Sequence, residues 1–537
     1  MIKAGRALAL ITMWVSMTLL QPNLVKADQL SGSDTMRGRL DRAGDVHSLI
    51  LDIGQGGYVA GAVKTAAPVT LELLDGDGKP MRRLADQQSG QIDFRIVAPN
   101  DQPVLRLTNM GPGKNDFEFD LQFMVELADQ GAPSRHYQSP AIASAAQDLA
   151  RGIVTDGFWD RVQRDGTPLI EPLNEDEVIM TFVARGLERN GRIVGAPSND
   201  HEYLERLGNS DIWFKSFIVP NSSRLSYQIA RDVPEFDADF RSQRVALLAT
   251  IQADPFNQHP WPVDAPDAFN QDSVVELPDA PDQPGMNGTT AHKGTLETFV
   301  FNSERLGNSR DITLYRPYQF DPANHDNVLL ILFDAKEYLT TVPTPRILDN
   351  LIAAGKLPPV SVAFIANPDR AARGRELPGN PDFANMLADD LMPVLRDRFG
   401  ADFAAARTVL AGSSYGGLAS ATVALSHPDV FGNAISMSGS FWWHPQNTPV
   451  DQGEFVAHQV ATGPRRPIRF FMTAGLFETG RMGVAGIVES GRHLRDVLIA
   501  RGYDVQYREY AGGHDYVVWR GALADGLIGL FGTVSAK

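Results

Sequence analysis

The spacing of apolar and polar residues changes character along the chain. Between residues 28 and about 130, short runs of alternating apolar and polar residues are separated by turn sequences, such as the Asp-Gly-Asp-Gly at residues 75–78. Alternation with a period of two is typical of strands that bury one face, and short, regularly spaced strands favour a β-sandwich. Residues 28–130 are therefore predicted to form an all-β domain.

A second β-rich domain is predicted over residues 150–260. A linker rich in Ala, Ser and Gln precedes it, at about residues 130–147, and a stretch rich in Pro and Asp follows it, at residues 264–282. Its clearest strand signals are the apolar runs at residues 178–184, 212–219 and 226–230. These strands again favour a sandwich-like arrangement.

From about residue 295, strand and helix patterns alternate. Amphipathic stretches typical of helices cover residues 383–399 and 483–501. The strand signals are the apolar runs at residues 328–333, 360–365, 408–411 and 469–473. Strands that are apolar throughout are buried on both faces, and their alternation with helices indicates a mostly parallel sheet. Residues 295–537 are therefore predicted to form an α/β domain.

The first 27 residues match a signal peptide. Lys3 and Arg6 form a positive start, residues 7–20 are almost entirely apolar, and residues 25–27 fit a small-x-small cleavage pattern. We expect cleavage after Ala27 and a periplasmic or secreted protein. An uncleaved membrane anchor is the alternative, although the apolar stretch is short for a membrane span. No later segment is long and apolar enough to cross a bilayer.

Composition and charge narrow the classes of function. The 537-residue chain is 43% hydrophobic and 21% charged, which is ordinary for a globular protein, and its formal charge is −16. Cleavage after Ala27 would remove three cations and no acid, and would shift the charge to −19. Such a surface repels nucleic acid. Because the chain has no cysteine, disulfides, cysteine nucleophiles and thiolate metal sites are excluded.

The strongest chemical signal is a G-x-S-x-G sequence at residues 412–416, with Ser414 at its centre. It follows an apolar strand, residues 408–411, and precedes a helical run, residues 418–425. This strand–turn–helix context is the nucleophile elbow of α/β-hydrolases, whereas an ordinary glycine-rich turn is the alternative. The predicted fold class is therefore an α/β-hydrolase catalytic domain preceded by two all-β, sandwich-like domains.

A serine hydroxyl needs a neighbouring base, and in this fold the base follows the last strand. His514 lies in this place, after the strand predicted at residues 505–510. The acid that orients the histidine follows the penultimate strand, and this order favours Glu478. Asp515, or a Ser–His pair without a fixed acid, remains an alternative.

The oxyanion of acyl transfer needs backbone N–H donors. One is expected from Tyr415, directly after the nucleophile, and the other from Ala335 or Lys336, in the loop after an early strand. Together these residues predict hydrolysis of an ester of a small molecule. The chemistry needs no metal and no organic cofactor.

Further motifs accompany the elbow in one order along the chain. They are Phe158-Trp159, Asp211-Ile212-Trp213, Ser303-Glu304-Arg305-Leu306, Arg373-x-x-Glu376-Leu377-Pro378, Ser438-Gly439-Ser440-Phe441-Trp442-Trp443, Gly512-Gly513-His514-Asp515 and Trp519-Arg520-Gly521. With these motifs, the chain from about residue 158 onward resembles the enterobactin esterases, which hydrolyse the trilactone of ferric catecholate siderophores. Residues 28–130 loosely resemble the pre-peptidase C-terminal β-sandwich, which is not part of that family's usual plan.

The resemblance implies roles for individual residues. Ser414 and His514 match the family's nucleophile and base. Arg373 falls where the family has an arginine suited to an anionic catecholate, because a guanidinium pairs with charge and stacks on rings; an ion pair with Glu376 is the alternative. The tryptophans of the motifs are candidates for apolar walls of the substrate site or for core packing: Trp442, Trp443 and Trp519.

Three functions stay open at this point. The first is an exported esterase for catecholate siderophores, to which iron would come with the substrate. The second is an exported carboxylesterase of the same fold for other aryl or acyl esters, such as feruloyl esters. The third is a non-catalytic ligand-binding module. The sequence does not fix the oligomeric state.

Overall fold

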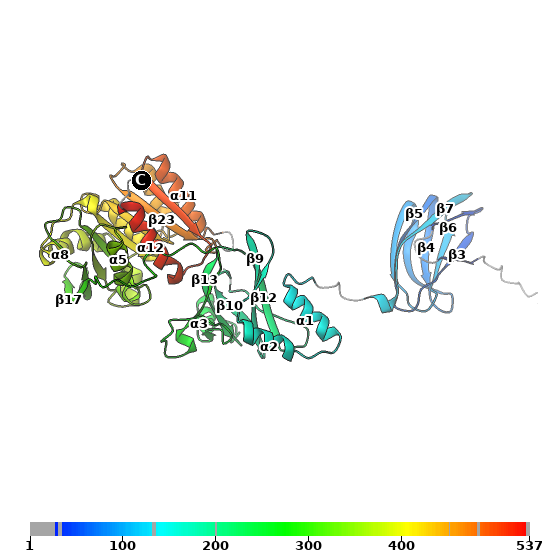
Figure 1. Ribbon diagram of the computed structural model, residues 1–537. Helices are drawn as coiled ribbons and strands as arrows, with labels where there is room; N and C mark the ends of the chain where they lie inside the picture. Colours follow the sequence, from blue (N-terminus) through cyan, green and yellow to red (C-terminus); the bar gives the residue numbers. More distant parts are fainter. Residues whose placement is uncertain are drawn as a thin grey trace, which may run out of the picture. The chain divides into compact units, whose positions relative to one another are not determined.

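The computed structural model describes residues 27–30, 35–130, 136–198, 201–449, 452–480 and 484–532. The predicted signal peptide, apart from Ala27, lies outside the described residues. The chain divides into two compact units, with the boundary between His136 and Tyr137 (Figure 1). In the described part of the chain, no helix combines the length and the apolar character that a membrane span requires.

The first unit is a seven-stranded sheet that folds around its own core (Figure 1). The strands are β1 (Ala27–Leu30), β2 (Thr35–Leu40), β3 (Val46–Leu51), β4 (Tyr58–Leu74), β5 (Pro80–Val97), β6 (Val104–Asn109) and β7 (Asn115–Val125), followed by a 3₁₀ helix, Leu127–Asp129. The long strand β4 pairs with β7 through its first half and with β6 through its second. Where β4 bends, the buried Asn115 accepts hydrogen bonds from the backbone N–H groups of Ala66 and Ala67, so no backbone donor is left unpaired there.

The second unit begins with α1 (Pro140–Ala150) and α2 (Asp156–Asp165), which lie on a small β domain. One of its sheets has the order β11-β12-β9-β8 and the other β10-β13-β16-β15, with β14 paired to β13. Their bounds are β8 (Leu169–Pro172), β9 (Glu177–Arg185), β10 (Gly191–Gly195), β11 (Glu205–Arg206), β12 (Ile212–Pro220), β13 (Arg224–Arg231), β14 (Ile251–Gln252), β15 (Pro260–Trp261) and β16 (Asp272–Glu276). Helix α3 (Phe240–Leu248) and the 3₁₀ helix Ala268–Asn270 complete it.

The β domain is less purely β than its sequence predicts. Part of the predicted linker forms α1, because Ser139 caps the helix N-terminus, Pro140 follows at the first helical position, and the helix itself is rich in alanine. Residues of α1 and α2 cover one face of β9 and β12, while the second sheet covers the other face. This double cover explains why β9 is buried at nearly every position.

The α/β domain contains an eight-stranded sheet in the order β17-β18-β20-β19-β21-β22-β23-β24. The strands are β17 (Thr295–Ser303), β18 (Asn308–Arg316), β19 (Val328–Phe333), β20 (Val360–Ile365), β21 (Thr408–Ser413), β22 (Asn433–Met437), β23 (Arg469–Gly475) and β24 (Asp504–Tyr510). The first two strands are antiparallel, and β19 to β24 run parallel.

Helices cover both faces of this sheet, so its central strands are buried throughout. One face carries α7 (Pro381–Asn385), a π-helical segment (Met386–Leu391), α8 (Met392–Phe399), α9 (Tyr415–Ser426), α10 (Phe455–Thr462) and α11 (Ile487–Ala500). The other carries α4 (Ala335–Leu339), α5 (Thr344–Ala353) and α12 (Tyr516–Phe531). Helix α6 (Arg370–Glu376) and a 3₁₀ turn (Ala405–Arg407) join strands. The predicted α/β-hydrolase domain, preceded by β-rich regions, is confirmed.

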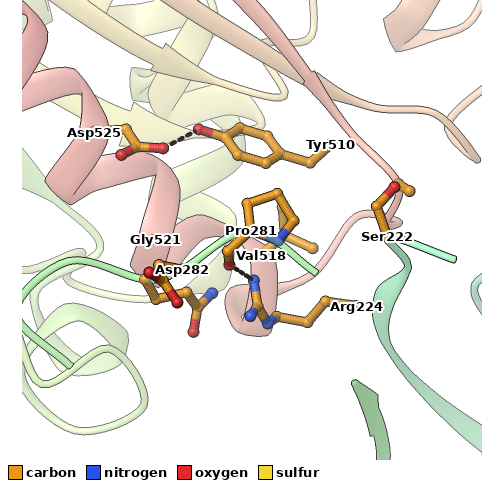
Figure 2. Close-up of a pocket in the computed structure, with 10 residues that line it drawn as sticks. Ser222, Arg224, Pro281, Asp282, Tyr510, Val518, Gly521 and Asp525 are labelled. Atoms are coloured by element: carbon orange, nitrogen blue, oxygen red, sulfur yellow. Dashed lines mark hydrogen bonds between the residues drawn. The ribbon is translucent and has the colours of Figure 1, made fainter. Parts of the chain in front are cut away.

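The β domain and the α/β domain meet around the end of β24. Figure 2 shows this joint: Arg224 of β13 donates a hydrogen bond to the carbonyl of Pro281, and Tyr510 donates one to Asp525 of α12. The cavity between them holds only about 10 Å³, roughly the room of one water molecule. It is therefore a packing gap within the joint and too small for a substrate.

Candidate active site

Ser414 occupies the sharp turn between β21 and α9. Its backbone is strained, with φ 58° and ψ −120°. The chain crosses itself here so closely that a Cβ at Gly412 would lie 2.7 Å from the backbone of Gly416, which is why the turn needs glycine. The N–H of Ser414 donates to the carbonyl of Met437 on β22. These features are those of a nucleophile elbow, as the sequence predicts.

The parallel register brings the candidate residues to one edge of the sheet. Ser413 pairs with Met437, and Met437 pairs with Thr473, so the carboxyl ends of β21, β22 and β23 are level. Ser414 follows β21 directly, while Glu478 and His514 follow β23 and β24 within a few residues. Loops at the carboxyl ends of parallel strands meet at that edge, so residues far apart in sequence line one site.

Glu478 lies against His514. Its Oε1 is 2.5 Å from Nδ1 of the imidazole, and its side chain is only 4% exposed. The other carboxylate oxygen accepts hydrogen bonds from the N–H of Gly475 and the hydroxyl of Ser438. Trp519 donates to that hydroxyl and sets its ring edge-on to the imidazole, 4.8 Å between centroids. The carboxylate therefore fixes the orientation of the histidine and would stabilise its positive charge.

Asp515 has a different place. Its Oδ1 accepts from the N–H of Val517 and caps α12, while its Oδ2 accepts from the N–H of Ser226 in the β domain. Burial raises the pKa of this carboxyl. Burial, and then the neighbouring charge of Asp515, also raises the pKa of Asp272 to about 7. Of the two candidate acids, the structure places Glu478 on the imidazole and Asp515 in the joint between domains.

The predicted oxyanion donors lie beside the nucleophile. Tyr415 begins α9, and the N–H groups of a first helical turn have no partner inside the helix. Ala335 begins α4 directly after β19, whose Leu332 pairs with Ala411 of β21. Before it stands Asp334, in a left-handed conformation at φ 59°. Both donors are thus at the sheet edge that carries Ser414.

Arg373 supports this loop. Its guanidinium donates two hydrogen bonds to the carboxylate of Asp334, at 2.7 and 2.8 Å. The alternative of an ion pair with Glu376 is wrong, because Glu376 is buried and accepts from Arg310. The residues lining the cleft that contains Ser414 do not include Arg373. The guanidinium of Arg373 therefore holds the oxyanion loop. The structure does not support the predicted contact of Arg373 with substrate.

The three tryptophans separate in the structure. Trp442 is 40% exposed and lines the cleft. Trp443 is partly buried and packs edge-on against Phe455 at the margin of the domain core. Trp519 is buried under the histidine and acts through Ser438. Only Trp442 is placed as a wall of the substrate site.

The cleft has a volume of about 810 Å³ and two walls. The α/β domain contributes Ser414, Ser440, Trp442, His514 and the loops around Phe477 and Ile487. The β domain contributes Gly195, Ala196, Ser198, His201, Ser226 and Arg244. No sequence motif marks the wall formed by the β domain, so the sequence does not predict it. Ser440, by contrast, belongs to the motif at residues 438–443.

The hydroxyl of Ser414 lies 3.4 Å from that of Ser440. Between Ser414 and His514, both in the described part of the chain, no hydrogen bond forms. Catalytic hydrogen bonds often tighten only in the complex with substrate, so the roles of Ser414 and His514 do not depend on a hydrogen bond between them here. Within the described ranges, no three His, Asp or Glu side chains gather closely enough to hold a metal ion.

The sheet order and the strained serine define an esterase of the α/β-hydrolase fold, and the model of a putative esterase family matches residues 303–530. The model of the N-terminal domain of enterochelin esterase matches residues 183–286. The iron(III) enterobactin esterase of Dickeya dadantii is 32% identical over 414 residues, which are 69% of this chain and 92% of the relative. The chain belongs to the enterobactin esterase family.

Three further similarities have a comparable extent. The iron(III) salmochelin esterase of Escherichia coli is 29% identical over 72% of this chain and 97% of the relative. The crystal structure of the ferric enterobactin esterase of Salmonella typhimurium superimposes with a TM-score of 0.57 at 27% identity, over 70% of this chain and 98% of that one. The corresponding Shigella flexneri enzyme, crystallised in the presence of enterobactin, gives 0.56 at 26% identity, over 70% and 97%.

Proposed function

We propose that the protein hydrolyses the ester bonds of a catecholate siderophore of the enterobactin type. The observation that carries this proposal is the near-complete match to an iron(III) enterobactin esterase, over 92% of its length. The match spans both walls of the cleft, because the two family models cover the β domain and the α/β domain. The cleft volume of about 810 Å³ also lies near the upper end of the range for small-molecule binding sites.

In the proposed reaction each group of the site has a role. His514, oriented by Glu478, takes the proton of Ser414 as the hydroxyl attacks an ester carbonyl. The N–H groups of Tyr415 and Ala335 receive the oxyanion. His514 then protonates the leaving alkoxide and activates the water that releases the acyl group.

Export belongs to the same proposal. It is supported by the positive start, the apolar stretch and the small-x-small sequence before Asp28. Cell fractionation of the full-length chain, with sequencing of the mature N-terminus, tests it. Recovery outside the cytoplasm with Asp28 as the first residue supports export, whereas a cytoplasmic protein that keeps residues 1–27 contradicts it.

The experiment for activity compares the mature protein with Ser414→Ala on ferric and iron-free enterobactin. The products are separated by chromatography. Linear dihydroxybenzoylserine species from the wild type alone support the proposal. If the wild type leaves both forms intact but cleaves simple aryl esters, the substrate assignment fails while the catalytic one stands.

A further inference from the structure

The cleft carries a single lysine or arginine among its described lining residues, and this residue is Arg244. It comes from α3 of the β domain and lines the same cleft as Ser414. Within the described ranges, no carboxylate forms an ion pair with its guanidinium. The side chain is exposed, and α3 is held in place by Leu247, which packs on Ala230 and Val233.

The carboxylates that line the cleft already have hydrogen-bond partners within the protein. Glu478 is bonded to His514, and Asp515 accepts two backbone hydrogen bonds inside the joint. Arg373, the arginine expected to meet an anionic substrate, is bound to Asp334. The protein as a whole is strongly acidic, with a formal charge of −16, and so repels anions in general. An anionic substrate therefore needs a local positive charge to enter.

We infer that Arg244 is a specificity-determining residue, through which the β domain selects esters that carry negative charge. The inference rests on the proposed function in one respect: a ferric tris-catecholate is anionic and has the flat rings on which a guanidinium stacks. Arg244 takes no part in the chemistry, because Ser414, His514 and the oxyanion donors all come from the α/β domain, whereas Arg244 comes from the β domain. Its loss changes binding of the anion and leaves the turnover of neutral esters intact.

The test uses Arg244→Gln and Arg244→Glu, with Arg241→Gln as the matched control. Arg241 lies on the same helix, is also exposed, and does not line the cleft. Each change is made in Ser414→Ala, so that ferric enterobactin binds without being cleaved, and binding is followed by tryptophan fluorescence. We expect the Kd to rise about fivefold for Arg244→Gln and about 25-fold for Arg244→Glu, but less than twofold for Arg241→Gln.

Catalysis supplies the second readout. With Ser414 intact, Arg244→Gln should leave kcat/KM for neutral 4-nitrophenyl butyrate within twofold of the wild type. Its KM for an anionic ester with the same leaving group, mono-4-nitrophenyl succinate, should rise about fivefold and depend less on salt. Equal losses on both esters, or equal Kd values for the Arg244→Gln and Arg241→Gln proteins, would overturn the inference.

The two proposals fail in different ways. If Ser414→Ala does not bind ferric enterobactin and the wild type does not cleave it, the siderophore assignment fails. The pair of 4-nitrophenyl esters still decides whether Arg244 selects negative charge. Thermal unfolding confirms that each variant is folded before its binding is measured.

Discussion

Replacing Glu478 by glutamine would test the catalytic site most directly. One carboxylate oxygen of Glu478 receives two donors, the N–H of Gly475 and the hydroxyl of Ser438. The hydroxyl proton of Ser438 must point to Glu478, because Trp519 donates to its oxygen. A glutamine at this position would turn its carbonyl oxygen toward these donors. Its NH₂ group would then face Nδ1 of His514.

This orientation forces the wrong tautomer on the histidine. Nδ1 would have to accept a hydrogen bond from the amide, so the ring proton would sit on Nε2, the nitrogen that should take the proton of Ser414. The equivalent change in serine proteases lowers kcat about 10⁴-fold, and we expect Glu478→Gln to lower it by about 10³- to 10⁴-fold. That loss corresponds to about 4–5.5 kcal/mol of transition-state stabilisation.

The assay is the kcat for 4-nitrophenyl butyrate, measured beside Glu509→Gln as control. Glu509 forms an ion pair with Arg492 of α11 and does not line the cleft, so its loss should change kcat less than twofold. Thermal unfolding shows whether each variant is folded. If Glu478→Gln keeps more than a tenth of the wild-type kcat, the carboxylate does not orient the base, and a Ser–His pair without a fixed acid describes the enzyme better.

Three further predictions follow from contacts around the site. The pKa of Asp272 is raised to about 7, so the contribution of Asp272 to the free energy of unfolding is largest at acid pH and is lost as pH rises from about 4 through 7. The gain in Tm from Asp272→Asn should therefore be larger at pH 8 than at pH 5. A gain that does not depend on pH would contradict this prediction. A Cβ at Gly513 would lie 2.6 Å from that of Ala196. Gly513→Ala should therefore lower kcat by about tenfold or more, and adding Ala196→Gly should restore most of the lost kcat. A double variant whose kcat is no higher than that of the single variant counts against the clash. Trp519→Phe keeps the ring beneath His514 but loses the bond to Ser438, and kcat should fall about three- to tenfold; a change of less than twofold would show that this bond is dispensable.

The chemistry of the site could be predicted because it follows the chain order of its fold. Ser414 stands in a local motif, and His514 and Glu478 follow from their places after particular strands. The role of Arg373 could not be predicted in this way. Its partner Asp334 directly follows β19, and only the folded sheet brings that strand beside the elbow.

The helices of the β domain and the second wall of the cleft also could not be predicted from the sequence. Helix α1 lies in a stretch whose Ala, Ser and Gln content is equally typical of a linker. That Arg244 and Ser414 line one cleft depends on how two domains pack, and nothing in the spacing of either residue encodes that packing. Periodicity records local structure well, whereas contacts between domains leave little periodic signal.

The loop that carries His514 is shared between two domains, and this limits how the protein can evolve. Arg224 and Ser226 of β13 both donate backbone hydrogen bonds to it, one to the carbonyl of Ala511 and one to Asp515. Backbone donors survive any substitution except proline, so these two hydrogen bonds tolerate sequence drift in the β domain. The same two hydrogen bonds oppose recombination. An α/β domain joined to an unrelated β domain would lose the contacts that hold the loop of its catalytic base. The two domains are thus expected to be inherited together.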